Sequence, residues 1–205
     1  MGDTTEQQRR ERARSANAQG MAALRGGDHA GAIAAFREAI AADPGAGALV
    51  RNLAHALRTA GDDAGELAAL ERALDLDRTD FVAQLRKAQN LERTGQEADA
   101  LAAWSGALQL AEGIEQPASG LEQELAAGRA FMAAMQQRLG THADRAYAEL
   151  ESALDETERR RVKAFYDHSL GRRRVYFNQC AGLYYPFLPA DEYFDRRHLP
   201  SLAAL

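Results

Sequence analysis

Three residues in the second half of the chain have the types that bind a metal ion. His142, Asp144 and His168 formally spell a His-x-Asp pair followed by a distant histidine, a pattern of ligands suited to non-haem iron. In a helix, residues two positions apart point about 200° away from each other, so His142 and Asp144 would not converge on one ion. Thr141 and Asp144 fit better as a helix N-terminal cap. We therefore predict no metal site at these residues.

The other reactive side chains also lack the partners that catalysis needs. Cys180 is the single cysteine and has no evident base beside it, which favours a structural thiol over a nucleophile. A lone cysteine cannot form an internal disulfide, which indicates a reducing compartment. His29, His55 and His198 are isolated and are expected to be solvated or hydrogen-bonded. With no phosphate-cradling glycine loop and no Ser/His/Asp arrangement, the sequence predicts that this chain is not an enzyme and holds no cofactor.

The composition indicates a globular helical protein. The 205 residues are 46% hydrophobic and 27% charged, and Ala and Leu dominate them. The net charge is -5, which gives no overall attraction to nucleic acid. The chain begins with a Gln/Arg/Glu-rich stretch and has no apolar run of membrane-spanning length. We predict an all-α protein that is cytoplasmic, binds no membrane, and has a flexible N-terminus over residues 1–12.

A 34-residue period organises the chain from Ala13 onward. With Ala13 as position 1, small residues recur at positions 8 and 27 and a large apolar residue at position 24. These residues are Gly20, Ala54 and Ala88; Ala39, Ala73 and Ala107; and Phe36, Leu70 and Trp104. Small residues let two antiparallel helices approach closely, while the large residue fills the gap toward the neighbouring pair. Gly27, Gly61 and Gly95 are expected to lie between the two helices of each pair.

The period and its positions resemble those of tetratricopeptide repeats, with units at 13–46, 47–80 and 81–112. The sequence departs from the pattern at Ala23, where the family has an aromatic residue, and at Glu66, where it has a small one. Arg78 and Glu112 replace its proline. The resemblance implies an all-α solenoid of helical hairpins that acts in protein–protein interaction.

In tetratricopeptide folds, six positions of each first helix line an inner groove. Those 18 positions here carry six arginines and one acidic residue, although the whole chain is acidic. The candidate groove residues are Arg14, Asn17, Arg25, Arg51, Asn52, His55, Arg58, Arg86, Gln89 and Arg93. One interpretation is a solvated helix surface. The other is a basic groove for an acidic peptide, because a guanidinium pairs with a carboxylate through two parallel hydrogen bonds.

The groove differs from that of the tetratricopeptide domains that clamp the carboxylates of chaperone tails. Asn52 and Arg86 match their pattern, whereas Asn17, Met21 and Val82 do not. We therefore do not expect a chaperone-tail clamp.

Beyond the repeats, Pro117 and Ser119 indicate a linker over residues 113–120. Two amphipathic helices are expected over 121–174, with Gly140 and Thr141 ending the first and capping the second. This pair could cover the apolar end of the solenoid, which a terminal repeat must hide.

The last 30 residues contain seven of the 14 aromatic residues and three of the five prolines. So short a segment cannot bury that much aromatic surface alone, and we expect self-association through it. The stretch VYFNQCAGLYYPFLP at 175–189, followed by EYFDR at 192–196 and LPSL at 199–202, resembles one particular family. It is similar to the entry to the catalytic domain of bacterial tetratricopeptide-containing aspartyl/asparaginyl β-hydroxylases, so residues 175–205 would begin such a domain.

That resemblance implies an iron(II) and 2-oxoglutarate dioxygenase whose metal and 2-oxoglutarate ligands would follow Leu205. Iron(II) and 2-oxoglutarate are thus implied only for a catalytic domain absent from this sequence. Two functions stay open. The chain is either the substrate-presenting region of such a hydroxylase or a stand-alone adaptor that binds acidic peptide segments.

Overall fold

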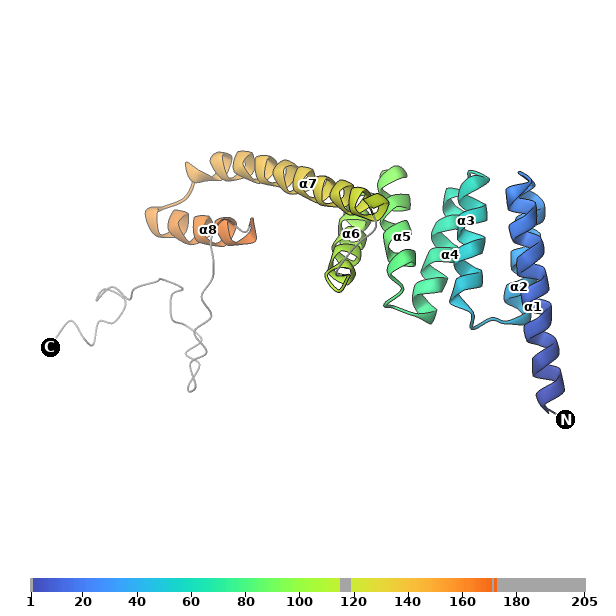
Figure 1. Cartoon of the computed structure of the whole chain (residues 1–205). Coiled ribbons are helices and arrows are strands. Elements are labelled where there is room, and N and C mark those ends of the chain that lie inside the picture. The colour runs from blue at the N-terminus through green and yellow to red at the C-terminus, as the bar shows by residue number, and fades with distance from the viewer. Residues whose placement is uncertain (1, 115–118, 171, 173–205) are drawn as a thin grey trace, which may run out of the picture. The chain divides into compact units, whose positions relative to one another are not determined.

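The structure, a computed structural model, describes residues 2–114, 119–170 and 172. By its internal contacts the chain divides into two units, residues 1–135 and 136–205. The described residues form helices and no strand, which confirms the predicted all-α class (Figure 1). None of the described helices is long and apolar enough to cross a lipid bilayer.

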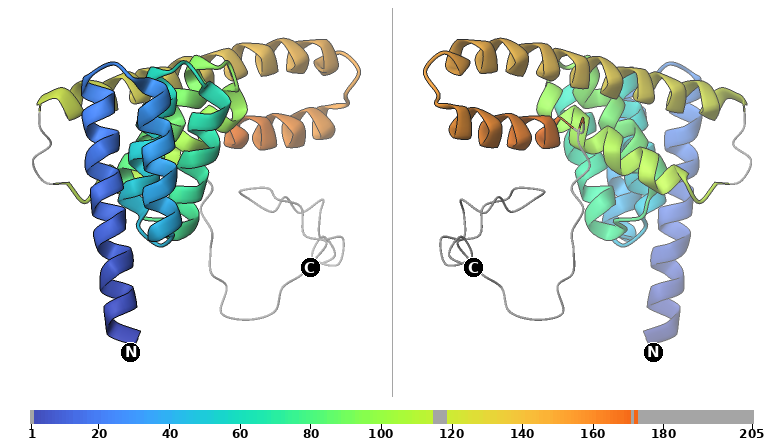
Figure 2. Two further views of the ribbon diagram at one scale, coloured as in Figure 1. Left: turned by 90° about the vertical axis from the view of Figure 1, so that its right-hand side faces the viewer. Right: turned by 90° about the vertical axis from the view of Figure 1, so that its left-hand side faces the viewer.

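Six helices of the first unit form three antiparallel hairpins, each made of two consecutive helices. The hairpins are α1 (Gly2–Arg25) with α2 (His29–Ala42), α3 (Gly47–Thr59) with α4 (Asp63–Leu76), and α5 (Phe81–Arg93) with α6 (Glu97–Ala111). Figure 1 shows them side by side, and Figure 2 views them along the row, with α1 and α2 in front in its left panel. The helix α7 (Ser119–Glu151) follows, and α8 (Glu156–Ser169) completes the described helices.

The turn inside each hairpin depends on one glycine. Gly27, Gly61 and Gly95 have φ of +78°, +78° and +76°, a backbone conformation that residues with a side chain rarely adopt. The predicted turn glycines are therefore confirmed. Asp28 and Asp62 then cap the second helices, because each carboxylate accepts a hydrogen bond from an amide three residues ahead.

Small and large residues pack between the helices as the period predicts. A Cβ added to Gly20 would lie 2.6 Å from the Phe36 ring, so only glycine leaves room for this ring. Trp104 packs in the same way against Gly128 at the start of α7. The small residues at positions 20 and 27 have no exposed surface where they are alanine: Ala32, Ala39, Ala73, Ala100 and Ala107.

The N-terminal region differs from the flexible segment predicted for it, since residues 2–12 form the start of α1. Its Gln, Arg and Glu residues are good helix formers. Arg10 pairs with Glu6 one turn earlier, at 2.6 Å, and Arg12 pairs with Glu38 of α2, at 2.9 Å. These contacts extend the first helix well beyond the repeat.

The break predicted at Gly140 and Thr141 is wrong, because α7 continues through both residues to Glu151. Thr141 does not cap a new helix; its hydroxyl donates to the Gln137 carbonyl one turn earlier, at 3.0 Å. The break comes instead before Asp155, which caps α8 and forms a reciprocal capping box with Glu158. Ser119 and residue 120 belong to α7 rather than to the predicted linker, of which residues 115–118 lie outside the described residues.

In the second unit, α8 contacts the end of α7 through polar and aromatic groups. The rings of Tyr147 and Tyr166 stack with their centroids 5.3 Å apart. Asp144 accepts hydrogen bonds from the Tyr166 hydroxyl and from Arg172, the latter at 2.7 and 2.9 Å. Asp144 therefore belongs to a helix–helix contact rather than to a cap or a metal site.

Candidate functional site

An open pocket of about 180 Å³ lies among α3, α4 and α5. Nine residues line it: Arg51, Asn52, Ala54, His55, Arg58, Glu66, Leu70, Val82 and Arg86. The residues 51, 55 and 58 of α3 share one helix face by their spacing of four and three, and Val82 and Arg86 do so on α5. Five of the ten candidate groove residues therefore come together in this pocket.

The other five candidates lie outside the pocket lining. Arg14, Asn17 and Arg25 are on α1, and Gln89 and Arg93 are on α5. Arg14 and Arg25 are exposed, and within the described residues neither forms an ion pair. Asn17 instead accepts a hydrogen bond from the Asn52 amide, at 2.9 Å, which joins α1 to α3.

Arg51 is held by an acidic residue that the groove positions do not include. Its guanidinium pairs with Asp80, whose side chain is 5% exposed. Asp80 also caps α5 by accepting from the Ala83 amide at 3.1 Å. Arg51 thus neutralises the buried carboxylate that caps α5, and this ion pair leaves fewer of its N–H groups for a ligand.

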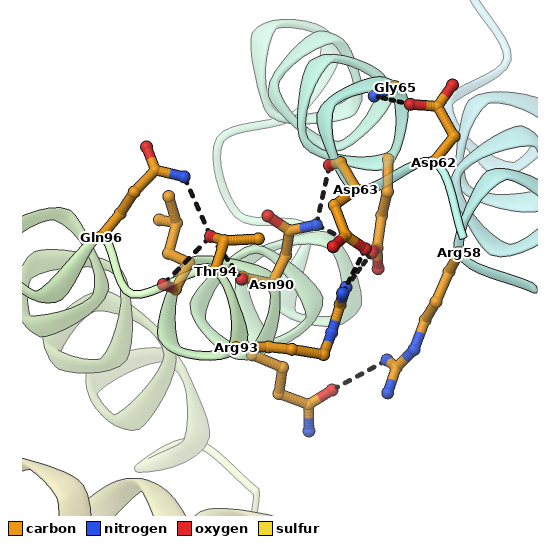
Figure 3. A network of polar contacts seen from close by, with 11 residues as sticks. Arg58, Asp62, Asp63, Gly65, Asn90, Arg93, Thr94 and Gln96 are labelled. Carbon is orange, nitrogen blue, oxygen red and sulfur yellow. Dashed lines mark hydrogen bonds and ion pairs between the residues drawn. The ribbon is translucent and has the colours of Figure 1, made fainter.

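Arg93 is held in the same way, by two acidic residues of α4. It pairs with Asp63 and with Glu66, the latter at 2.6 Å, while the Asn90 amide donates to the same Glu66 oxygen at 2.8 Å (Figure 3). The Glu66 side chain is only 2% exposed. Because a buried carboxylate is costly without partners, Asn90 and Arg93 are what make Glu66 tolerable at a position where the repeat family has a small residue.

The sequence analysis did not predict this buried network, although it noted Glu66 as a departure from the repeat pattern. Glu66 stands out as a departure from the repeat pattern, but nothing in its own repeat satisfies it. The signal lay in the next repeat, where Asn90 and Arg93 are three residues apart and so on one face of α5. A charged residue at a buried repeat position calls for such a search in the neighbouring helices.

Arg58 and Arg86 differ from Arg51 and Arg93, because no carboxylate of the described residues pairs with them. Arg58 donates to the Gln89 side-chain oxygen at 3.4 Å, and Arg86 makes no hydrogen bond within the described part of the chain. His55 lies with them in the pocket lining. Partial burial lowers the pKa of His55, and the charges of Arg86 and Arg58 lower it further, against the opposing charge of Glu66.

The predicted excess of arginine in the groove is thus partly cancelled by Asp63, Glu66 and Asp80. These acids come from α4 and from the residue before α5, which lie outside the 18 positions. Within the pocket, the remaining positive charge is concentrated at Arg58 and Arg86. Two guanidinium groups that have no carboxylate partner among the described residues are suited to an anionic group such as a carboxylate.

No group of three or more His, Cys, Asp or Glu side chains that could hold a metal ion occurs among the described residues. Cys180, His198 and the whole 175–205 segment, which carries the hydroxylase resemblance, lie outside the described residues.

The fold has counterparts among solved structures. The chain is similar to the TPR2B domain of yeast Sti1 in its Hsp70-peptide complex, with 22% identity and a TM-score of 0.52 over 58% of this chain and 97% of that one. It is similar to the Arabidopsis OM64 TPR domain, with 18% identity and a TM-score of 0.53 over 62% of this chain and 98% of that one. The P58(IPK) TPR domain matches 78% of this chain and 46% of its own, with 20% identity and a TM-score of 0.53.

No family model matches the sequence, and no curated protein sequence matches it. The structural likenesses therefore bear on the fold alone. Together with the three hairpins and their 34-residue spacing, they show that the chain folds as a tetratricopeptide helical solenoid.

Proposed function

We propose that the solenoid binds a protein segment that carries carboxylates, and that Arg58 and Arg86 receive one of them. The observation that carries this proposal is the pocket among α3, α4 and α5, in which two arginines have no carboxylate partner among the described residues. The acidic residue that lines it, Glu66, and the third arginine, Arg51, are already paired. A ligand carboxylate would supply the missing counter-charge.

Solved tetratricopeptide domains support a role in peptide binding. The first TPR domain of Spaghetti (RPAP3) is bound to the HSP90 peptide SRMEEVD, with 20% identity and a TM-score of 0.52 to this chain. That peptide carries three acidic residues in its last four positions. In this chain the amide of Asn52 is already bonded to Asn17, and Val82 presents an apolar side chain. We therefore propose an acidic ligand other than a chaperone tail.

The proposed role is binding without turnover, so iron(II) and 2-oxoglutarate have no part in it. The association with a hydroxylase rests on residues 175–205, to which no comparison adds support. A regular helical groove with two half-buried arginines that lack a carboxylate partner among the described residues explains binding on its own, and it is the function that we carry forward.

The test is a double charge reversal in the pocket. The variant Arg58→Glu with Arg86→Glu should bind a labelled acetyl-Gly-Ser-Asp-Ser-Asp-Ser-Asp-Ser-Gly peptide at least about tenfold more weakly than the unchanged protein. Arg51 is kept, because reversing it would place a second negative charge against the buried Asp80. Fluorescence anisotropy measures the binding, and circular dichroism checks that the variant is still helical.

The matched control is Arg14→Glu with Arg25→Glu, which makes the same change in net charge on exposed residues of α1. It should weaken binding much less. Binding should also fall as salt is added, since exposed charges are screened over roughly 8 Å at physiological ionic strength. Equal losses in the two double variants, or binding that resists both reversal and high salt, would show that this pocket is not the binding site.

A further inference from the structure

Val82 is the one aliphatic side chain that lines the pocket and is widely exposed, at 47% of its surface, within the described residues. The other apolar lining residues, Leu70 and Ala54, are 1% and 2% exposed and therefore offer a ligand almost no surface. Exposed aliphatic surface inside a concave site loses contact with water when a ligand covers it, which favours an apolar ligand group there.

The pocket is large enough to receive ligand side chains. Its volume of about 180 Å³ is slightly larger than the apolar cavity of about 150 Å³ known to accept benzene. The carboxylate of Glu66 does not repel an occupant strongly, because Asn90 and Arg93 already satisfy it. The available surfaces are thus an aliphatic one at Val82 and a cationic one at Arg58 and Arg86.

The spacing of these surfaces sets a spacing in the ligand. Val82 and Arg86 lie on one face of α5, four residues and so about 6 Å apart along the helix axis. In an extended peptide, side chains two residues apart point to the same side and are separated by about 6.6 Å. Side chains of adjacent residues point to opposite sides and could not both enter the pocket.

We propose that the pocket recognises an aliphatic residue placed two positions from an acidic residue in an extended segment, with the aliphatic side chain on Val82 and the carboxylate between Arg58 and Arg86. This inference rests on the proposed function and adds the ligand pattern to it. It separates this site from a groove that attracts any acidic peptide through charge alone.

The test compares three peptides that carry the same charge in the same Gly-Ser flanks. Their central residues are Asp-Ser-Leu-Ser-Asp, Asp-Ser-Asn-Ser-Asp and Asp-Leu-Ser-Ser-Asp. The first places leucine two residues from both acids, so the direction of the peptide does not matter. It should bind about tenfold more tightly than the other two, the gain expected from partly burying one leucine side chain.

The variant Val82→Ser should remove this preference, so that the leucine peptide binds no more tightly than the asparagine peptide. Leu76→Ser is the matched control, because Leu76 is 43% exposed near the end of α4 and does not line the pocket. It should keep the full preference. Both residues are exposed, so neither change should unfold the protein.

The titration of His55 gives a second readout that does not depend on affinity. The charged groups that act on it are Arg58 on its own helix, Arg86 on α5 and Glu66 on α4, while α1 presents the uncharged Asn17 to α3. A bound carboxylate between the two arginines adds negative charge, so the pKa of His55 should rise in the complex. Nuclear magnetic resonance of its ring protons would follow this change with the leucine peptide.

The outcomes separate the two proposals. Equal binding of all three peptides that still depends on Arg58 and Arg86 would overturn the ligand pattern and keep the proposed function. Absence of binding by all three and by the fully acidic peptide would overturn both. A preference for leucine that survives Val82→Ser would also overturn the pattern, because the apolar contact would then lie elsewhere.

Discussion

The hairpins of the solenoid and the contact between α7 and α8 are both pairs of helices, yet they are stabilised differently. In the solenoid, alanines with no exposed surface surround buried rings such as Phe36 and Trp104. The contact between α7 and α8 includes a tyrosine stack and the ion pair of Asp144 with Arg172, whose side chains are 53% and 44% exposed. Burial of apolar surface is worth much more than an exposed ion pair. The repeats should therefore carry most of the stability.

Polar contacts inside the solenoid follow the same distinction. The pair of Lys87 with Glu71 lies at the surface, whereas Arg93 reaches a Glu66 side chain that is almost fully buried. The buried carboxylate favours this position of α4 against α5, because here Asn90 and Arg93 of α5 satisfy it. The pocket is lined by the same two helices and by Glu66 itself, so the network helps to position the candidate site.

The largest effect on stability should come from removing the Trp104 ring, which packs between α6 and α7. Trp104→Ala should lower the free energy of unfolding by about 3–5 kcal/mol, because it leaves a cavity and removes the packing on Gly128. Urea denaturation followed by circular dichroism measures it. Leu150→Ala, at a residue that is 53% exposed in α7, is the control and should change that free energy by less than about 0.5 kcal/mol. Comparable losses from both changes would contradict the contrast between the two regions.

The second effect should come from the buried network. Arg93→Ala removes the cationic partner of Glu66 and should cost about 2–3 kcal/mol, somewhat less than a fully buried pair because Arg93 itself is 40% exposed. Lys87→Ala should cost less than about 1 kcal/mol, since it breaks only a surface pair. The same urea experiment compares them. If Lys87→Ala lowered the free energy of unfolding as much as Arg93→Ala does, the burial of Glu66 would not explain the contribution of the network to stability.

The hairpins could be predicted from the sequence because their determinants are local and periodic. The turns at Gly27, Gly61 and Gly95 require a positive φ, so the sequence has a glycine every 34 residues. Close packing of the helices requires small residues, so alanines recur at fixed positions of the repeat. The ion pairs could not be predicted in this way. A long arginine side chain can reach several helices, and the partners of Arg51 and Arg93 lie at positions that no groove pattern includes.

The course of α7 shows a second limit of periodic patterns. Gly128 and Phe131 are three residues apart, as are the small position 8 and the aromatic position 11 of a repeat. Gly128 packs against Trp104, and Phe131 packs against the core around it, so the start of α7 acts as the first helix of a further repeat. The extra residues between α6 and α7 shift the register and hide this signal. Gly140, by contrast, looked like a helix end but is tolerated within a long helix.

The smallest effect should come from the exposed contact between α7 and α8. Hydrogen bonds from Arg172 and Tyr166 hold the pKa of the Asp144 carboxyl well below its ordinary value. A carboxyl with a lowered pKa stabilises the folded state above its ordinary pKa of about 4 and loses that contribution as the pH falls toward the lowered value. The contact should therefore be constant near neutral pH and weaken only in acid.

Asp144→Asn should remove this contribution at neutral pH, and amide hydrogen exchange in α8 should then be about two- to threefold faster, as befits a surface ion pair. Asp167→Asn is the matched control, because Asp167 pairs with Lys163 inside α8 and does not bond to α7. Both changes remove one negative charge, so a difference between them isolates the contact between the helices. Exchange that responds equally to both would mean that α8 is stabilised by its own pairs rather than by the contact of Asp144 with it.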